Sequence, residues 1–227
     1  MWHNFARTAA ATALWSVTHS ALASSTAKHA AARWAGPRAE AGLYRGFYNA
    51  QSTVTFAALI AYIRRLPNQE IYHAHGPVAG LLRAGQAVGL LGMGWTALHI
   101  GPGRLSGLDG LVPLAIGAAV TPPAEGHGPT PEPWPSGYVP ATGPFRHTRH
   151  PMNVFMPLVM WLNPRMTVNL LAFNLVGTAY FVVGSALEEA RLSREMGPRY
   201  EDYRHRGIPF YVPRLSDPAT ETGGDRA

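Results

Sequence analysis

Three groups of residues in the second half of the chain can bind the charged parts of a small molecule. They are, in chain order, Arg149, His150 and Pro151, then Glu188 and Glu189, then Tyr200 and Tyr203. A guanidinium binds a carboxylate through two parallel hydrogen bonds, a carboxylate holds an ammonium group, and a tyrosine ring attracts a cation to its face. The three groups together therefore suit a ligand that carries a carboxylate, an ammonium group and a further cationic centre.

Each of these groups also has a purely structural explanation. Arg149 fits an ordinary charged anchor at a membrane surface, and adjacent glutamates at a helix end commonly form a solvated face. Tyr200 and Tyr203 fit the aromatic belt that membrane proteins place at the bilayer boundary. The functional interpretation therefore depends on the three groups occurring in order around one apolar hairpin, with Pro151 fixing the turn that directs His150 inward.

The order and spacing of the three groups resemble the C-terminal half of integral-membrane methyltransferases. This family includes isoprenylcysteine carboxyl methyltransferases, phospholipid methyltransferases and methanethiol S-methyltransferases. Its pattern is Gly-x-Tyr/Phe-x-x-x-Arg-His-Pro-x-Tyr, then Glu-Glu-x-x-Leu, then Gly-x-x-Tyr-x-x-Tyr. The chain matches this pattern, within residues 143–213, at Gly143, Phe145, Arg149, His150, Pro151, Glu188, Glu189, Leu192, Gly197, Tyr200 and Tyr203.

The resemblance implies a membrane-embedded methyltransferase that uses S-adenosyl-L-methionine as its cofactor. By resemblance, the cofactor-binding residues are Arg149, His150, Pro151, Glu188, Glu189, Tyr200 and Tyr203, with His150 and the glutamate pair as the direct contacts. The methyl acceptor would be a lipophilic compound or a small thiol or carboxylate. His150 and His19 are the candidate catalytic residues, because an imidazole can assist a thiol acceptor by taking its proton.

Two positions depart from the family pattern. Asn153 stands where the family usually has tyrosine, and Phe155 stands where it usually has glycine. The first change removes an aromatic wall, and the second adds bulk where a helix or the cofactor approaches. An alternative hypothesis is therefore a non-catalytic accessory or assembly subunit of a membrane complex that retains the methyltransferase scaffold.

The N-terminal half resembles a second group, the NnrU-type membrane proteins, in segments 15–24 and 44–48. That group is linked to nitrogen-oxide reduction and is similar to a plant carotenoid isomerase that uses haem. A further alternative is therefore a haem-linked isomerase or redox protein. His19 is a functional candidate because ionisable residues are rare inside membrane helices. The candidate axial ligands of haem are His73, His75 and His99.

Composition indicates a small membrane protein with sizeable polar loops. Of the 227 residues, 47% are apolar and 14% are charged, well below the roughly 25% charged residues of soluble domains. The formal charge of +6 comes from Lys and Arg that lie mostly between apolar stretches, which favours a membrane-facing surface over nucleic-acid binding. The absence of cysteine excludes disulfides and thiolate ligands, and we expect no metal site.

The apolar segments predict an all-α, polytopic membrane bundle of about five transmembrane helices. The expected helices are 5–23, 47–63, 78–100, 152–162 and 166–187, of which the last two form a C-terminal hairpin. Residues 108–120 are expected to be re-entrant or interfacial, because they are short for a span and contain Asp109 and Pro113. Gly85 and Gly89, four residues apart, predict close packing of the third helix against a neighbour.

We expect one membrane domain over residues 1–216, followed by a disordered tail at 217–227. The domain divides into a three-helix part (1–103), a re-entrant segment with a Pro/Gly-rich loop (104–150), and a methyltransferase-like hairpin with a cytoplasmic helix (151–216). Arg7 and the small residues at 21–23 also fit a cleaved signal peptide. The polar interruptions of this first apolar stretch favour a retained helix.

Placement of Lys and Arg predicts the orientation in the membrane. Five crossings with the N-terminus outside put the basic first loop (24–46), the loop at 121–140 and the C-terminus in the cytoplasm, where the cofactor is found. The composition, rich in Ala, Gly, Arg and Pro, suggests the cytoplasmic membrane of a bacterium. Expected partners are membrane lipid, a small lipophilic or thiol acceptor and other proteins of a membrane complex, and not nucleic acid.

Overall fold

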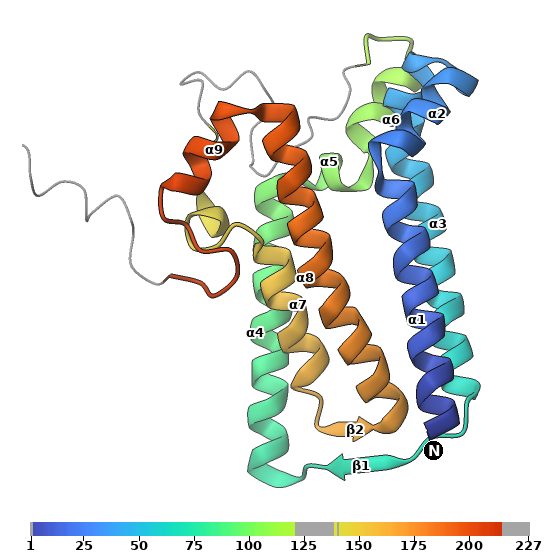
Figure 1. The fold of residues 1–227 in the computed structure, drawn as a ribbon, viewed down its shortest axis with the longest axis vertical. Helices are drawn as coiled ribbons and strands as arrows, with labels where there is room; N and C mark the ends of the chain where they lie inside the picture. Colours follow the sequence, from blue (N-terminus) through green and yellow to red (C-terminus); the bar gives the residue numbers. More distant parts are fainter. Residues whose placement is uncertain (1, 121–138, 140, 215–227) are drawn as a thin grey trace, which may run out of the picture.

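The computed structural model describes residues 2–120, 139 and 141–214, and most of them are helical (Figure 1). The predicted all-α class is therefore confirmed. In this described part, four long helices run between the two ends of the molecule: α1 (Trp2–Ala23), α3 (Pro37–Arg65), α4 (Gly76–Ile100) and α8 (Val168–Met196). The shorter α7 (Pro151–Trp161) packs along part of α4.

Short elements gather at the two ends of these helices (Figure 1). One end carries α2 (Ser25–Ala35), α5 (Pro102–Ser106), α6 (Leu108–Ala115), η1 (Gly143–Arg146) and α9 (Pro198–His205). At the other end, β1 (Glu70–His73) pairs antiparallel with β2 (Arg165–Thr167), with Tyr72 opposite Met166 and His73 opposite Arg165. This small sheet ties the connection between α3 and α4 to the turn between α7 and α8.

Capping residues, glycine and proline set the helix boundaries at the first of these ends. The Ser24 side chain caps α2 by accepting a backbone N–H at 3.2 Å. Gly197 has a φ of +56°, which glycine adopts without strain, and it separates α8 from α9. Pro198 begins α9 and Pro151 begins α7, as suits a residue that has no backbone N–H to satisfy. His150 therefore occupies the position directly before α7.

The glycines of α4 face α7, as the sequence predicted. A Cβ atom on Gly89 would lie 2.9 Å from the carbonyl oxygen of Phe155, and one on Gly85 would lie 2.3 Å from Cδ1 of Leu162. Side chains at these positions would push the two helices apart, so the glycines permit their close approach. On the other side of the bundle, α1 packs along α8.

The bundle carries apolar side chains outward and polar side chains inward. Leu81, Leu91 and Leu98 of α4 are 74%, 73% and 72% exposed, whereas Thr96 of the same helix and Asn174 of α8 are fully buried. This distribution is the reverse of a soluble protein's and fits a surface in contact with lipid. Among the described residues, α8 alone is long and apolar enough to span a bilayer by itself. These observations support a membrane protein and leave the number of crossings as a prediction.

Three expected elements differ from those observed. The segment expected to be the first loop forms α2 and the first part of α3, because its alanine-rich sequence favours helix and Gly36 interrupts it only once. The last long helix begins at Val168, after Thr167, because the preceding residues pair with β1 and the Thr167 side chain caps the helix. Helix α6 ends at Ala115, short of residue 120. The expected loop at 121–140, apart from residue 139, and the expected tail at 217–227 lie outside the described residues.

Candidate functional site

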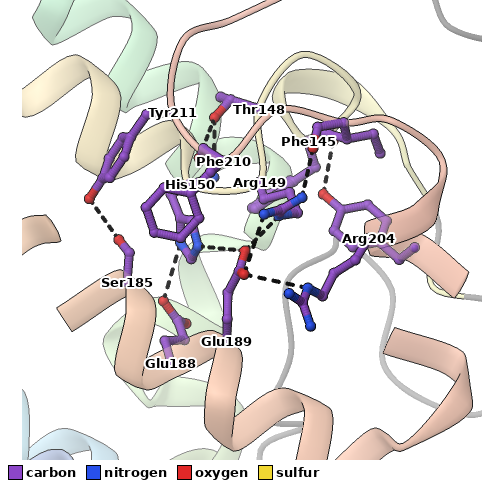
Figure 2. Close-up of polar contacts among 12 residues, drawn as sticks. Phe145, Thr148, Arg149, His150, Ser185, Glu188, Glu189, Arg204, Phe210 and Tyr211 are labelled. Carbon is purple, nitrogen blue, oxygen red and sulfur yellow. Dashed lines mark hydrogen bonds and ion pairs between the residues drawn. The ribbon is translucent and has the colours of Figure 1, made fainter. Parts of the chain in front are cut away.

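A network of charged side chains centres on Glu189 of α8 (Figure 2). Arg149 Nε donates to Glu189 Oε1 at 2.5 Å and its Nη2 donates to Oε2 at 3.3 Å, which is a two-point guanidinium–carboxylate contact. His150 Nε2 lies 3.2 Å from Glu189 Oε1, and Arg204 Nε lies 3.6 Å from Oε2. The Glu189 side chain is only 10% exposed, so its charge depends on these three partners.

Residues 207–214, which follow α9, hold the segment before α7 in place. Arg149 donates its backbone N–H to the carbonyl of Pro209 at 2.9 Å and its Nη1 to the carbonyl of Ile208 at 2.8 Å. Thr148 Oγ1 donates to the carbonyl of Phe210 at 3.1 Å. Sequence reasoning missed this segment, because its contribution is made largely by backbone carbonyls that no residue pattern reveals.

His150 lies between the two glutamates and is almost completely buried. Its Nδ1 is 3.6 Å from Glu188 Oε2, and its Nε2 faces Glu189 (Figure 2). The ring of Phe210 meets the imidazole edge-on, with centroids 4.8 Å apart. The structure thus brings together Arg149, His150, Glu188 and Glu189, four of the residues that the resemblance assigned to the cofactor.

Tyr200 and Tyr203 are placed elsewhere. Both are fully buried in a core cluster with Val139, Leu192 and Ile208. The Tyr203 hydroxyl donates to the carbonyl of Phe145 at 2.9 Å, which ties α9 to η1. Burial raises the pKa of both phenols, so they stay neutral. In this structure the two tyrosines pack α9 against its neighbours and do not face the open space described next.

A cavity of about 540 Å³ opens beside His150, within the roughly 300–1,000 Å³ typical of small-molecule sites. The residues around it from the C-terminal half are Phe145, His150, Pro151, Met152, Asn153, Glu188, Arg191 and Glu195. The residues from the N-terminal half are Ala23, Ser25, Lys28, His29, Glu40, Tyr44, Arg45, Tyr48, Ile100, Arg104 and Leu105. Burial lowers the pKa of Arg104, and the nearby Asp109 carboxylate opposes that shift. Both halves of the chain thus build the cavity, and the cations of the N-terminal half were not identified from the sequence.

Arg149 and Glu189 do not line the cavity. They stand behind His150, where Arg149 is fully engaged with Glu189 and with backbone carbonyls. Glu189, expected as a direct contact of the cofactor, and Arg149, expected as a partner for its carboxylate, therefore lie outside the cavity wall in this structure. Among the predicted cofactor residues, the cavity is lined by His150, Pro151 and Glu188.

The other histidines do not join His150. His19 of α1 bonds through both ring nitrogens, to Tyr48 at 2.6 Å and to Ser52 at 3.0 Å. His75 and His99 lie at opposite ends of α4, a helix of 25 residues that is about 37 Å long. His73 lies beside His75, with ring centroids 4.3 Å apart, so a single haem cannot be held between His99 and either of these two histidines. The described residues contain no group of three or more His, Asp or Glu suited to a metal ion.

The two departures from the family pattern have different surroundings. Asn153 lines the cavity and donates to Ser185 Oγ at 2.7 Å. Phe155 points away from it onto α4, where its ring occupies the space left free by Gly92. The added bulk of Phe155 therefore meets a helix and not the cavity, and only Asn153 changes the cavity wall.

Comparison with known proteins supports the class that this site suggests. The chain is similar to integral-membrane methyltransferases of the isoprenylcysteine carboxyl methyltransferase-like type, as its motifs predicted. It is 42% identical over 71 residues to methanethiol S-methyltransferase 2 of Bradyrhizobium diazoefficiens, a match covering 31% of this chain and 27% of the relative. It is 42% identical over 69 residues to the methanethiol S-methyltransferase of Crocosphaera subtropica (30% and 27%) and 34% identical over 71 residues to that of Pseudomonas deceptionensis (31% and 27%).

These matches span about a quarter of the length of the curated relatives. No family model matches the chain, and no solved structure matches it significantly. The similarity therefore bears on one part of the protein, and the activity of the whole is a matter for proposal.

Proposed function

We propose that this protein is a membrane-embedded, S-adenosylmethionine-dependent methyltransferase whose acceptor is a small thiol. The observation that carries the proposal is the buried His150, which joins a cavity of suitable size to the Arg149–Glu189 pair. The arrangement occurs in a chain with 42% identity, over 71 residues, to a protein named methanethiol S-methyltransferase 2. The thiol acceptor is taken from the names of those relatives.

The residues at the cavity wall suit the charges of the cofactor. Glu188 would hold its ammonium group, with His150 fixed beside it by Glu189. Because Arg149 is engaged elsewhere, the cations for its carboxylate would come from the wall itself, where Arg45 and Arg191 lie. Bound there, the cofactor supplies a methyl group on a sulfonium, which is already a good leaving group. The chain then has to orient the acceptor and exclude water.

The proposal places the cavity end of the bundle in the cytoplasm of a bacterium and the β1–β2 end outside. Five crossings, with the N-terminus outside, give this orientation. Because the chain contains no cysteine, labelling of single introduced cysteines can measure this orientation without background. In inverted and right-side-out vesicles, a membrane-impermeant maleimide is expected to label His75→Cys only from outside and His205→Cys only from inside. Labelling of both from the same side would contradict the orientation.

Binding of S-adenosylhomocysteine to the detergent-purified protein tests the cofactor site. A ligand that binds only the folded state raises its stability by about 2.7 kcal/mol at 100 times its Kd. We expect thermal stabilisation of the wild type and its loss in His150→Ala, since His150 lines the cavity between two glutamates. His205→Ala is the matched control, because this histidine is exposed and does not line the cavity.

The possible results separate the hypotheses. Stabilisation of His150→Ala equal to the wild type's would contradict the assigned site. No stabilisation of a folded wild type would contradict the methyltransferase and support the accessory-subunit hypothesis, which predicts co-purification with a partner complex. A Soret band in the purified protein would support the haem-linked alternative.

A further inference from the structure

A polar and aromatic cluster lies behind the cavity wall, where α1, α3 and α8 meet. His19 Nε2 is 2.6 Å from the Tyr48 hydroxyl, and His19 Nδ1 is 3.0 Å from Ser52 Oγ. The indole of Trp15 stacks on the imidazole with centroids 4.7 Å apart, and Tyr180 meets it edge-on at 6.2 Å. The imidazole is therefore fixed through both nitrogens and by two aromatic neighbours.

Tyr48 connects this cluster to the cavity. Its side chain lines the same cavity as His150 and Glu188, whereas His19 and Ser52 stand behind it. Ionisable side chains within a membrane bundle are costly and usually functional. Through Tyr48, His19 lies one hydrogen bond from the space where an acceptor would bind.

The hydrogen bonds around Ser52 are compatible with a His19 ring that carries its proton on Nδ1. The Gln51 amide donates to Ser52 Oγ at 2.8 Å, and that oxygen has a second acceptor site for the His19 Nδ1–H. With its proton on Nδ1, His19 accepts the Tyr48 hydroxyl proton at Nε2. This arrangement leaves lone pairs of the Tyr48 oxygen able to accept a proton from a ligand in the cavity.

We infer that Tyr48 takes the proton of a thiol acceptor while passing its own proton to His19; this inference rests on the proposed methyltransferase function. The S–H bond of the acceptor breaks, its proton goes to the Tyr48 oxygen, and the Tyr48 proton goes to His19 Nε2. The freed sulfur electron pair forms the new S–CH₃ bond. The C–S bond of the sulfonium breaks, and its electron pair stays on the sulfur of S-adenosylhomocysteine. After product release, His19 returns the proton to solvent through Tyr48.

The inference gives a chemical reason for the thiol acceptor of the proposed function. A low-dielectric cavity raises the pKa of a thiol, so the acceptor arrives protonated and is a weak nucleophile. A positioned proton acceptor is then worth roughly 10²–10⁴ in rate. A carboxylate acceptor already reacts as its anion and would need no proton acceptor. Of the two acceptors, only a thiol therefore needs the Tyr48–His19 pair.

The role of Tyr48 and His19 is tested by measuring the rate of methyl transfer to a series of thiols of decreasing acidity. Tyr48→Phe is expected to lose roughly 10²–10⁴ in rate with weakly acidic alkyl thiols and much less with acidic aryl thiols, which deprotonate without help. The matched control is Tyr62→Phe, which removes a hydroxyl on the same helix that accepts a hydrogen bond from Arg7 at 3.1 Å, far from the cavity. It is expected to keep the wild-type rate with every thiol. An equal loss by Tyr48→Phe for acidic and weakly acidic thiols would overturn the inference.

Two further readouts separate this inference from the proposed function. With S-adenosylhomocysteine in place of the methyl donor, an aryl thiol whose anion absorbs at longer wavelength is expected to be more ionised on the wild type than on Tyr48→Phe. His19→Asn is expected to resemble Tyr48→Phe, and the double variant to be no worse than either, because the two act as one unit. Equal ionisation, or additive losses, would overturn the inference. A wild type that binds no S-adenosylhomocysteine would overturn the proposed function itself.

Discussion

Replacing Glu189 by alanine is expected to destabilise the protein by about 3–5 kcal/mol, because it leaves the partly buried Arg149 without its carboxylate partner. Glu189 accepts two hydrogen bonds from Arg149 and lies 3.2 Å from His150 Nε2. The same change removes the group that orients His150 at the cavity, so S-adenosylhomocysteine binding is expected to be lost as well. Thermal unfolding in detergent, with and without the ligand, measures both effects.

Glu70→Ala is the matched control for this change. Glu70 also pairs with an arginine, Arg165 at 2.6 Å, but both side chains are well exposed, at 41% and 64%. Exposed pairs of this kind contribute about 1 kcal/mol or less. A loss of stability in Glu189→Ala no greater than that in Glu70→Ala would contradict the stabilising role that the burial of Glu189 indicates.

The second large effect is expected where α4 meets α7. The ring of Phe155 fills the space above Gly92, where a Cβ atom would lie 2.3 Å from its Cδ1. Phe155→Ala is therefore expected to cost about 3–5 kcal/mol through the cavity it leaves. Gly92→Ala is expected to cost about 1–3 kcal/mol through overpacking. Neither change should abolish cofactor binding, because neither residue lines the cavity.

The double variant tests whether these two residues fit each other. The methyl group of Gly92→Ala enters space that Phe155→Ala vacates, so the combined loss should fall short of the sum by about 0.5–3 kcal/mol. Gly94→Ala is the control on the same helix, because a Cβ atom there meets nothing within 4 Å. It should be neutral or slightly stabilising, since glycine weakens a helix by roughly 0.5–1 kcal/mol relative to alanine. Simple additivity would contradict the contact.

Much of the fold could be predicted from the sequence because the long helices are marked by their apolar length and their glycine spacing. The separation of Gly85 and Gly89 predicted close packing of this helix against a neighbour, and the structure shows that the neighbour is α7. The β1–β2 sheet could not be predicted, because it pairs Tyr72 with Met166 across nearly a hundred residues and because β1 is exposed along its whole length. Pairing between such short, distant segments is decided by the helices that bring them together.

The site was predictable in its residues more than in their roles. The motifs singled out Arg149, His150 and Glu189, and the structure brings these three side chains together. Residue type could not show that Arg149 would donate its hydrogen bonds to Glu189 and to a backbone carbonyl, or that Tyr200 would be buried in a core. These outcomes depend on tertiary packing, and so does the contribution of cations from the N-terminal half.

The contacts of residues 207–214 with the segment before α7 have a consequence for folding during synthesis. Arg149 takes its geometry from carbonyls at Ile208 and Pro209, and His147 accepts the backbone N–H of Arg214 at 2.9 Å. These contacts cannot form until the chain has been translated past residue 214, and the last of the long helices, α8, ends before that point at Met196. The nascent chain can therefore place its long helices in the membrane first and complete this cavity wall only after residue 214 has been made.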